Sequence, residues 1–545
     1  MKQLLRLILA IYIFYVFPNS MTYCADKENQ HENFVQTDTA QTFEGGELII
    51  FEGIPFLKLS GNYYEMGKQY GVLMKDKIRE LYNYKKISDF VENGSYPPMW
   101  LVKWVTPDRY LDFIEGISDG SGIPYDEVFL INIALGVTGC SSVLLKDYNK
   151  ILLGHNQDRW LPSRFEIIVE FNPDDAYKYI LATDVGSGHV LMGMNEKGIC
   201  IANNAGRFTT DGFGLLWPTT SYMPAICKYR QILESASCME EVDELMDGYK
   251  TDGNILSVAS GTEADGAIYD IAYKNLQKNP LEGKNYLYAT NFYLNAVLND
   301  YPEKCLRYQL INNHLQNKPG FNINAMIDIL SERGTYQGVN NHITVNSIIF
   351  DPNEFQVYFA HEFAYAACGK WYKYDWIKDE FSVFRDAEPV LDIVSLKSFD
   401  SIKAASIRDT VNSDGELKLW SELYGFLNKD GIATAVPGFT IYHGKLEENN
   451  DVEIFVPVTE LRQDTERIHF KIFPGSEVAS ILHKGPHEGL TGAYDYLYKW
   501  IEENNYKVNG PAIVCYLKSG WIEKNPDEWI TEIRIPIKEK ELGVK

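Results

Sequence analysis

One cysteine of the chain, Cys140, directly follows a glycine, Gly139. A thiol attacks a carbonyl well only as its thiolate, and an unperturbed cysteine has a pKa of about 8.5, so it needs a base within reach. If the peptide bond before Cys140 is cut, the freed α-amine, with an unperturbed pKa of about 7.7–8.0, can serve as that base. Gly139 suits such a junction because a residue without a Cβ tolerates strained backbone geometry. The alternative for Cys140 is a buried structural thiol.

The segment that follows Gly139 is dominated by short β-type runs separated by turn-forming residues. The expected strands here are Ser142 to Leu145, Ile151 to Gly154, Glu166 to Phe171, Tyr179 to Thr183 and Ile199 to Asn203. Further strands are expected at 48–51, 55–59, 343–350 and 355–359, and helices at 64–82, 220–248 and 322–333. These elements predict a layered sheet-and-helix core of the α+β class, in which Cys140 precedes a strand.

The last part of the chain contains an internal repeat. Ala405-Ser406-Ile407 recurs as Ala479-Ser480-Ile481, 74 positions later, and Leu423-Tyr424 recurs as Leu497-Tyr498 at the same offset. Each half reads as strand, amphipathic helix, strand and strand. Matching elements in one order predict a single domain with pseudo-twofold symmetry over about 390–545.

The first residues indicate export. Lys2 and Arg6 precede eleven apolar residues, Leu7 to Phe17, and Pro18 ends the run. Eleven residues are too few to span a bilayer, which needs about 20, so the pattern predicts a signal peptide at 1–24. The alternatives are a lipid-anchored Cys24 and an uncleaved anchor. The polar residues from 25 to 44 are expected to form a disordered leader.

Composition excludes several classes of function. The formal net charge of -24 argues against nucleic acid or an anionic membrane surface as a partner. The eight cysteines are widely scattered without a C-x-x-C pair, which favours free thiols over disulfides. The histidines are equally scattered, so the sequence predicts no metal site. No later stretch reaches transmembrane length.

The surroundings of Cys140 resemble a known family. Gly139-Cys140-Ser-Ser, followed by the run Ile151 to Asp158, resembles the acyl-coenzyme A:6-aminopenicillanic acid acyltransferase family of N-terminal-nucleophile (Ntn) hydrolases, peptidase family C45. It is more distantly similar to penicillin V acylases and bile salt hydrolases. Segments 61–71, 195–198, 288–291 and 344–352 resemble the family in the same order. The resemblance therefore covers about residues 45–376.

This resemblance implies a catalytic set. Cys140 would attack an amide or thioester carbonyl, with its own α-amine carrying the proton. Asp158, 18 residues further on, would orient that amine. Asn204 and Asn291 would donate hydrogen bonds to the developing oxyanion, worth about 2.7–4 kcal/mol per donor, and Asn203 would contact the substrate. The alternative for each is a turn or sheet-edge residue.

The chain departs from the family pattern at two places. His155 stands where many relatives have an arginine that contacts an acidic group, and the resemblance implies that His155 contacts substrate. The family's arginine near the end of the core has no clear match, although Lys370 could substitute for it. The resemblance implies no cofactor.

The repeated part also resembles a known family. The segments 481–490 and 531–537 resemble the GyrI-like small-molecule-binding domain, which also occurs as the effector module of AraC-type regulators. This resemblance implies a cleft between two halves that binds cationic or aromatic compounds. Glu532 matches the family's acidic pocket residue, and Glu453 is its repeat partner. The aromatic walls are expected to be Tyr442, Tyr516 and Trp521, for which the alternative is a place in the core or at its rim.

Together these features predict a four-part chain of the α+β class. The parts are a signal peptide (1–24), a leader (25–44), a four-layer αββα Ntn-hydrolase core (45–380) that cleaves itself between residues 139 and 140, and a duplicated βαββ domain (390–545). The expected substrate is a small N-acyl amide. The sequence leaves open hydrolysis or acyl transfer; export, where acyl-CoA is scarce, favours hydrolysis. The alternative is an exported small-molecule-binding protein with an inactive Ntn scaffold.

Overall fold

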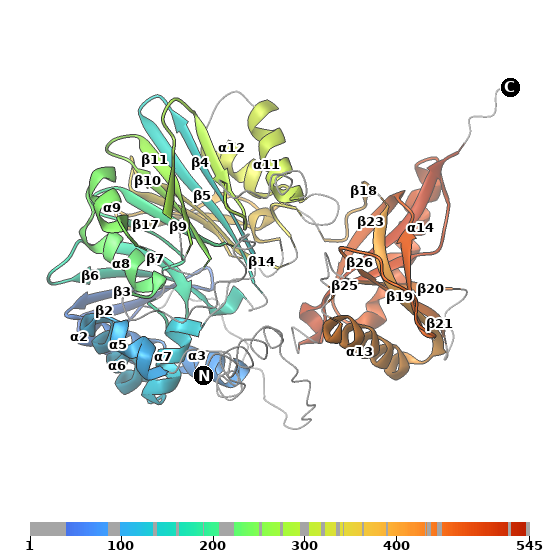
Figure 1. Cartoon of the computed structure of the whole chain (residues 1–545), viewed down its shortest axis with the longest axis horizontal. Helices are drawn as coiled ribbons and strands as arrows, with labels where there is room; N and C mark the ends of the chain where they lie inside the picture. Colours follow the sequence, from blue (N-terminus) through green and yellow to red (C-terminus); the bar gives the residue numbers. More distant parts are fainter. Residues whose placement is uncertain are drawn as a thin grey trace, which may run out of the picture. The chain divides into compact units, whose positions relative to one another are not determined.

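The computed structural model describes residues 40–85, 99–134, 139–159, 163–188, 190–206, 223–249, 253–272, 276–294, 305–317, 322–333, 338–341, 343–361, 365–388, 391–399, 401–430, 432, 438–443, 450–520 and 525–540. The expected signal peptide, the leader up to residue 39, and Trp521 lie outside these residues. The chain divides into two compact units. Residues 1–332 and 339–387 form the first unit, and residues 333–338 and 388–545 form the second. Each unit mixes helices and strands, which confirms the mixed α and β class (Figure 1).

A ten-stranded sheet runs through the first unit, and all its strand pairs are antiparallel except the parallel pair β3 and β6. In spatial order it contains β1 (Ala40–Phe43), β2 (Gly46–Phe51), β3 (Ile54–Gly61), β6 (Glu166–Pro173), β7 (Tyr179–Asp184), β8 (Met192–Asn195), β9 (Ile199–Ala205), β10 (Asn254–Ser260), β11 (Asp265–Ile271) and β12 (Leu276–Pro280). Residues 25–44 were expected to form a disordered leader. Residues 40–43 instead form strand β1, because they pair with β2.

A seven-stranded antiparallel sheet forms the other half of this unit. In spatial order it contains β13 (Tyr286–Ala289), β4 (Gly139–Asp147), β5 (Lys150–Asp158), β14 (Thr344–Asp351), β15 (Gln356–Ala360), β16 (Trp371–Asp375) and β17 (Glu380–Arg385). Strands β4 and β5 form a hairpin in which Gly139 pairs with Asp158 and Cys140 pairs with Gln157. The hairpin thus brings the two ends of the predicted catalytic motif together.

Nine described helices of this unit fall into two groups. The first group is α2 (Tyr63–Leu73), α3 (Lys75–Lys85), α5 (Met99–Val105), α6 (Asp108–Ser121), α7 (Tyr125–Ala134), α8 (Ala225–Ser235) and α9 (Met239–Met246); the second is α11 (Leu306–Asn317) and α12 (Ile323–Leu330). The helix expected at 64–82 is two helices, α2 and α3, and the one expected at 220–248 is α8 and α9. Helices α2 and α6 approach closely through glycines: a Cβ on Gly67 would lie 2.1 Å from the Phe113 carbonyl oxygen. Among the described residues, no helix is long and apolar enough to cross a membrane.

Three buried apolar clusters hold these layers. The first joins residues of the first helix group to the ten-stranded sheet, the second joins residues of both sheets, and the third joins the seven-stranded sheet to α11 and α12. Successive side chains of a strand point to opposite faces, so neighbours in sequence enter different clusters. In β9, Ile201 belongs to the first cluster and Ala202 to the second. This alternation decides which polar side chains of β4, β5 and β9 enter the space between the sheets.

The second unit is one nine-stranded sheet with two helices, α13 (Ser413–Lys429) and α14 (Leu490–Glu503). Its strands are β18 (Ser395–Phe399), β19 (Ile402–Val411), β20 (Phe439–Tyr442), β21 (Asn450–Pro457), β22 (Ile468–Phe473), β23 (Ser476–Lys484), β24 (Tyr506–Val508), β25 (Ile513–Lys518) and β26 (Ile530–Glu539). The halves meet where β20 pairs with β25. Outward from this junction the order is β21, β19, β22 on one side and β26, β23, β18 on the other, and each half packs its own helix.

Candidate functional site

Cys140 is the second residue of β4 and its side chain is 1% exposed. Leu144, on the same face of the strand, packs in the cluster between the two sheets, so the alternation directs Cys140 and Ser142 into this space as well. The residue before it has little room: a Cβ on Gly139 would lie 2.9 Å from Asp158 Oδ2. A side chain at position 139 would collide with the Asp158 carboxylate, so this close contact favours glycine here. The backbone freedom of glycine is a separate reason.

The backbone nitrogen of Cys140 is held by a side chain. Its N–H donates to Asn291 Oδ1 at 3.0 Å, and Asn291 Nδ2 donates to the Ala205 carbonyl at 2.7 Å. Asn291 follows β13 and Ala205 ends β9, so this amide links both sheets next to the thiol. The atom that would become the α-amine after cleavage thus has an acceptor in place.

Arg307, near the start of α11, is the cation of this site. Its Nη1 donates to the Cys140 carbonyl at 2.6 Å and lies 3.2 Å from Asp158 Oδ2, and its Nη2 donates to Asn291 Oδ1 at 2.6 Å. Arg307 was not predicted as a site residue, since nothing in its spacing from Cys140 marks it. Lys370, the expected substitute, pairs with Glu52 instead.

Asp158 ends β5 and is 3% exposed. Its second oxygen, Oδ1, accepts a hydrogen bond of 2.7 Å from Thr344 Oγ1. The carboxylate therefore lies between a guanidinium and a hydroxyl, beside the bond that precedes Cys140. The structure brings Cys140, Asp158 and Asn291 together, and their catalytic roles stay a prediction.

Burial raises the pKa of the Cys140 thiol to about 12, and the charge of Asp158 adds to the rise. Arg307, the backbone N–H of Ala205 and Arg159 oppose it. In the intact chain the thiol is thus protonated at neutral pH. Any nucleophilic role requires a group that accepts this proton.

Asn204 lies on the face of β9 that points between the sheets, and its amide is fully engaged. Its Nδ2 donates to Ser142 Oγ at 3.2 Å and to the carbonyls of residues 289 and 290 at 3.2 and 3.0 Å. Its Oδ1 faces His155 Nε2 at 3.1 Å. Burial lowers the pKa of His155 to about 4, so this ring is neutral and donates to Asn204. His155 therefore orients Asn204 in this structure.

Asn203 is not brought to Cys140. It shares its face of β9 with Ile201, which packs against the helices. Its side chain is 6% exposed. The expected contact of Asn203 with substrate stays a prediction.

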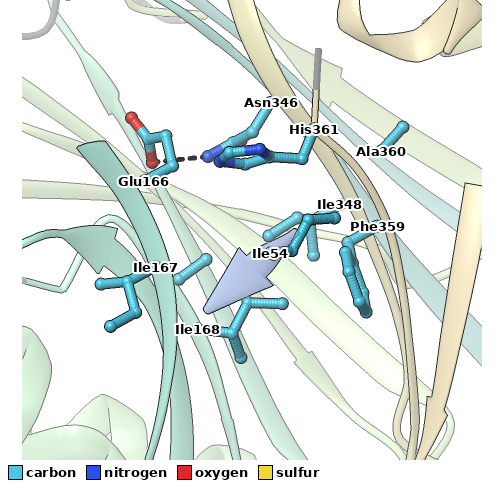
Figure 2. Close-up of a pocket in the computed structure, with 10 residues that line it drawn as sticks. Ile54, Glu166, Ile167, Ile168, Asn346, Ile348, Phe359, Ala360 and His361 are labelled. Carbon is cyan, nitrogen blue, oxygen red and sulfur yellow. Dashed lines mark hydrogen bonds between the residues drawn. The ribbon is translucent and has the colours of Figure 1, made fainter. Parts of the chain in front are cut away.

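A charged and polar row continues from Cys140 across the seven-stranded sheet. Gln157 pairs with both Cys140 and Asn346, so Asn346 lies two strands, or about 10 Å, from Cys140. Asn346 Nδ2 donates to Glu166 Oε2 at 2.8 Å. Both line a small pocket whose other walls are mainly apolar (Figure 2).

In the second unit, both predicted acidic residues are already paired. Glu532, 1% exposed, accepts from Lys397 Nζ and from Arg534 Nη2, each at 2.6 Å, and these cations hold its pKa well below the usual range despite burial. Glu453 accepts from Lys471 Nζ at 2.5 Å and faces His443 Nε2 at 3.1 Å. The repeat therefore places a lysine on each of the two acids.

The predicted aromatic residues meet a different acid. Tyr442 OH lies 2.7 Å from Tyr516 OH across the junction of the halves, and Tyr442 donates to Glu416 Oε2 at 2.8 Å. Glu416 belongs to α13 and was not singled out from the sequence, where it reads only as part of an amphipathic helix. Trp521 lies outside the described residues.

Comparison with known proteins identifies the second unit. Residues 392–538 match the model of the GyrI-like small molecule binding domain, which confirms the resemblance drawn from segments 481–490 and 531–537. No curated protein matches the chain.

The solved structures that are similar to the chain include EcmrR in its complex with DNA, with 30% identity and a TM-score of 0.26. That match covers 27% of this chain and 57% of EcmrR, so the chain spans little more than half of that relative. A Caenorhabditis elegans ortholog of N-acylethanolamine-hydrolyzing acid amidase has 19% identity and a TM-score of 0.32, over 39% of this chain and 93% of that one. A variant of conjugated bile acid hydrolase from Clostridium perfringens has 11% identity and a TM-score of 0.32, over 46% and 99%.

Proposed function

We propose that the first unit is an Ntn-type cysteine amidohydrolase that cleaves its own chain between Gly139 and Cys140 and then acts on small N-acyl amides. One observation carries the proposal: the Cys140 nitrogen is bonded to Asn291 while Arg307 joins Cys140, Asp158 and Asn291. Cleavage would release the α-amine of Cys140 beside the Asn291 amide oxygen. The Asp158 carboxylate and the Arg307 guanidinium already lie at the same place.

In the cleavage step, Cys140 Sγ attacks the Gly139 carbonyl carbon and the peptide nitrogen of Cys140 leaves, taking a proton to become the α-amine. The resulting thioester on Cys140 is hydrolysed by water, which frees the thiol and the Gly139 carboxylate. Asp158 leaves no space for a larger residue at 139, because a Cβ there would lie 2.9 Å from its oxygen.

After cleavage the α-amine becomes the general base. A nearby cation disfavours the protonated amine, so Arg307 lowers the amine pKa, whereas Asp158 orients the amine and favours its protonated form. The amine takes the thiol proton as Sγ attacks the substrate carbonyl and gives it to the leaving amine. Water then releases the acyl group; an amine taking it instead completes an acyl transfer.

Oxyanion stabilisation falls to donors that surround Sγ. The Asn291 amide and the Ala205 backbone N–H, which points at the Cys140 sulfur, both lie at this position. Asn204 would donate directly only if substrate binding displaced one of its three present acceptors. Its hydrogen bonds to Ser142 and to the carbonyls of residues 289 and 290 support a role in positioning Ser142 and Asn291.

The arrangement of helices, two sheets and helices, each joined by its own buried cluster, supports the four-layer αββα core of this class. In the second unit the mirrored strand order supports a duplicated βαββ domain that recognises a small molecule. We place the protein outside the cytoplasm on the basis of its first residues. The domain would bind part of the substrate or a regulatory ligand.

One observation favours a second candidate, a binding protein with an inactive Ntn scaffold. The Cys140 thiol is buried and strongly protonated, as in an ordinary core cysteine. This reading predicts a chain that stays intact and a thiol that does not react.

The test is a denaturing gel of the purified full chain combined with an activity screen. We expect two fragments, release of acid from N-acyl amino acids, penicillin V or bile-salt conjugates, and loss of both in Cys140→Ala. Cys238→Ala, at a half-buried cysteine of the same unit, is the matched control and should behave as wild type. An intact, inactive wild-type chain would support the binding protein instead.

A further inference from the structure

The two faces of strand β4 carry different groups at Cys140, because successive side chains of a strand point to opposite faces. Ser141 faces α11, where its Oγ lies 3.4 Å from Arg307 Nη1. Cys140 and Ser142 point the other way, into the space between the sheets, where Asn204 donates to Ser142. Arg307 therefore reaches the backbone of Cys140 from one face of the strand, while the thiol points to the other.

A second cation, Arg159, lies on the face to which the thiol points. Arg159 directly follows β5 and comes two residues after Gln157, so the alternation directs both side chains between the sheets. The backbone N–H of Arg159 donates to the Ile343 carbonyl at 2.7 Å, which continues the pairing of β5 with β14 by one residue. Its side chain is 2% exposed, so its charge acts through the protein interior and is little screened by water.

Gln157 connects this guanidinium to the thiol. It is the direct cross-strand neighbour of Cys140, and such neighbours have Cβ atoms about 4.5–5.5 Å apart. With its amide oxygen toward the guanidinium, Gln157 accepts from Arg159 Nη2 at 3.2 Å. The guanidinium is thus one side chain away from the thiol. Its charge accordingly acts to lower the pKa of Cys140, although less than the charge of Arg307 does.

Two carboxylates of the ten-stranded sheet hold Arg159 in place. Asp184, at the end of β7, accepts from both terminal nitrogens of the guanidinium, with 2.7 Å between Nη2 and Oδ2. Glu166, at the start of β6, lies 3.4 Å from Nη1. The bond between Asn204 and Ser142 places β4 opposite β9, which is two strands from β7 and three from β6. Both carboxylates are therefore farther from the thiol than the guanidinium is.

We propose that Arg159 is a supporting cation of the Cys140 site, a positioning residue whose charge favours the thiolate from between the sheets. The inference rests on the proposed nucleophilic role of Cys140 and adds a residue that the sequence pattern does not single out. When the α-amine takes the thiol proton, the charge that forms on Sγ faces a guanidinium that is already fixed and dehydrated. Such a preorganised charge needs no rearrangement at the moment of reaction.

The charges of the cluster give this proposal a sign. Removing the positive charge of Arg159 should raise the pKa of the Cys140 thiol, and removing the negative charge of Glu166 should lower it. Glu166→Gln keeps the shape of the side chain and leaves the pair between Arg159 and Asp184 intact. A purely structural role of the cluster predicts that both changes act in the same direction, because each removes one partner of a buried ion pair.

The experiment measures the rate at which iodoacetamide alkylates Cys140 in the purified full chain between pH 7 and 10, followed by mass spectrometry of the peptide that contains it. Below the thiol pKa this rate increases with the thiolate fraction. We expect Arg159→Met to slow alkylation by about threefold or more and Glu166→Gln to speed it by about twofold. Arg385→Met, at an arginine that pairs with Asp328 on α12, is the matched control and should change the rate less than about 1.5-fold.

Three results would overturn the proposal: no alkylation of wild-type Cys140 up to pH 10, equal rates in Arg159→Met and Arg385→Met, or a Glu166→Gln variant that is no faster than wild type. If Arg159→Met fails to fold, the comparison of Glu166→Gln with wild type decides alone.

The mass of the same peptide shows whether it begins at Cys140, so rates are compared within the cut or the uncut form. An uncut chain with the expected order of rates would refute the proposed self-cleavage and leave the effect of Arg159 on the thiol standing. A cut, active chain in which Arg159→Met and Arg385→Met react equally would refute the role of Arg159 alone.

Discussion

Cys140 in the first unit and Glu416 in the second both have a raised pKa, but their surroundings differ. Around Cys140, the Asp158 carboxylate and the Arg307 guanidinium form an ion pair, and Arg307 also donates to the Cys140 carbonyl. Around Glu416, the described partners are neutral hydroxyls and rings. The first arrangement places charged groups next to the thiol, and the second surrounds a carboxylate with neutral donors. A raised pKa alone therefore does not indicate what an ionisable group does.

The largest expected effect comes from the nucleophile. Cys140→Ala should abolish both self-cleavage and hydrolysis, because no other described thiol occupies the site. Cys140→Ser should retain slow cleavage, since a hydroxyl can still attack the Gly139 carbonyl and release the same amine. Fragment formation over time on a denaturing gel measures both. Equal cleavage by the alanine variant would show that a protease in the preparation cuts the chain.

Arg307 is the next most sensitive position. Arg307→Lys keeps the charge but cannot span Cys140, Asp158 and Asn291 at once, because lysine lacks the planar fork of arginine. We expect kcat to fall on the order of 10²-fold, as for loss of one stabilising donor. Arg164→Lys, whose arginine pairs with Glu80 away from the site, is the control and should retain full activity. Similar kinetics in both variants would remove Arg307 from the mechanism.

Gly139→Ala tests whether the close contact between residue 139 and Asp158 matters for self-cleavage. The added Cβ would meet Asp158 Oδ2 at 2.9 Å, so the carboxylate or the strand must shift before cleavage. We expect self-cleavage to slow by roughly tenfold, equivalent to about 1.4 kcal/mol of activation free energy. Gly425→Ala on α13, where nothing lies within 4 Å of the new Cβ, is the control. Unchanged cleavage in Gly139→Ala would mean that this contact has no part in the reaction.

The smallest expected effect concerns pH and His155. Its pKa is about 4 in the folded chain and about 6.5 when unfolded, so the unfolded state binds the extra proton between these values. The free energy of unfolding should therefore decrease as the pH falls from 6.5 to 4, with His155 contributing up to about 3 kcal/mol. Urea denaturation of wild type and His155→Gln across this range measures the difference. Parallel curves would show that the pKa of His155 does not change on folding.

Much of the fold followed from local patterns. The strands around Cys140 were predicted because apolar alternation is visible in the chain, and the repeated offset predicts the duplication of the last domain. Strand β5 was predicted to end at Gly154 but continues to Asp158, since His155 to Asp158 are polar residues buried between or beside sheets. Burial of polar residues is set by the tertiary structure, and the sequence pattern gives no sign of it.

The surroundings of the sites could be predicted only in part for the same reason. Cys140, Asp158 and Asn291 lie together, and their roles stay a prediction, whereas Arg307 reaches them from a helix 149 residues beyond Asp158. Lys397 likewise neutralises Glu532 from a strand 135 positions away. Such long-range partners decide whether an acid is free to meet a ligand, and no local spacing reveals them.

The proposed self-cleavage makes Cys140 the first residue of a new chain. N-terminal sequencing of the fragments of the purified protein measures this. We expect a fragment that begins Cys140-Ser141-Ser142 and is absent from Cys140→Ala. A single chain without this new terminus, or a fragment that begins at another residue, would contradict it.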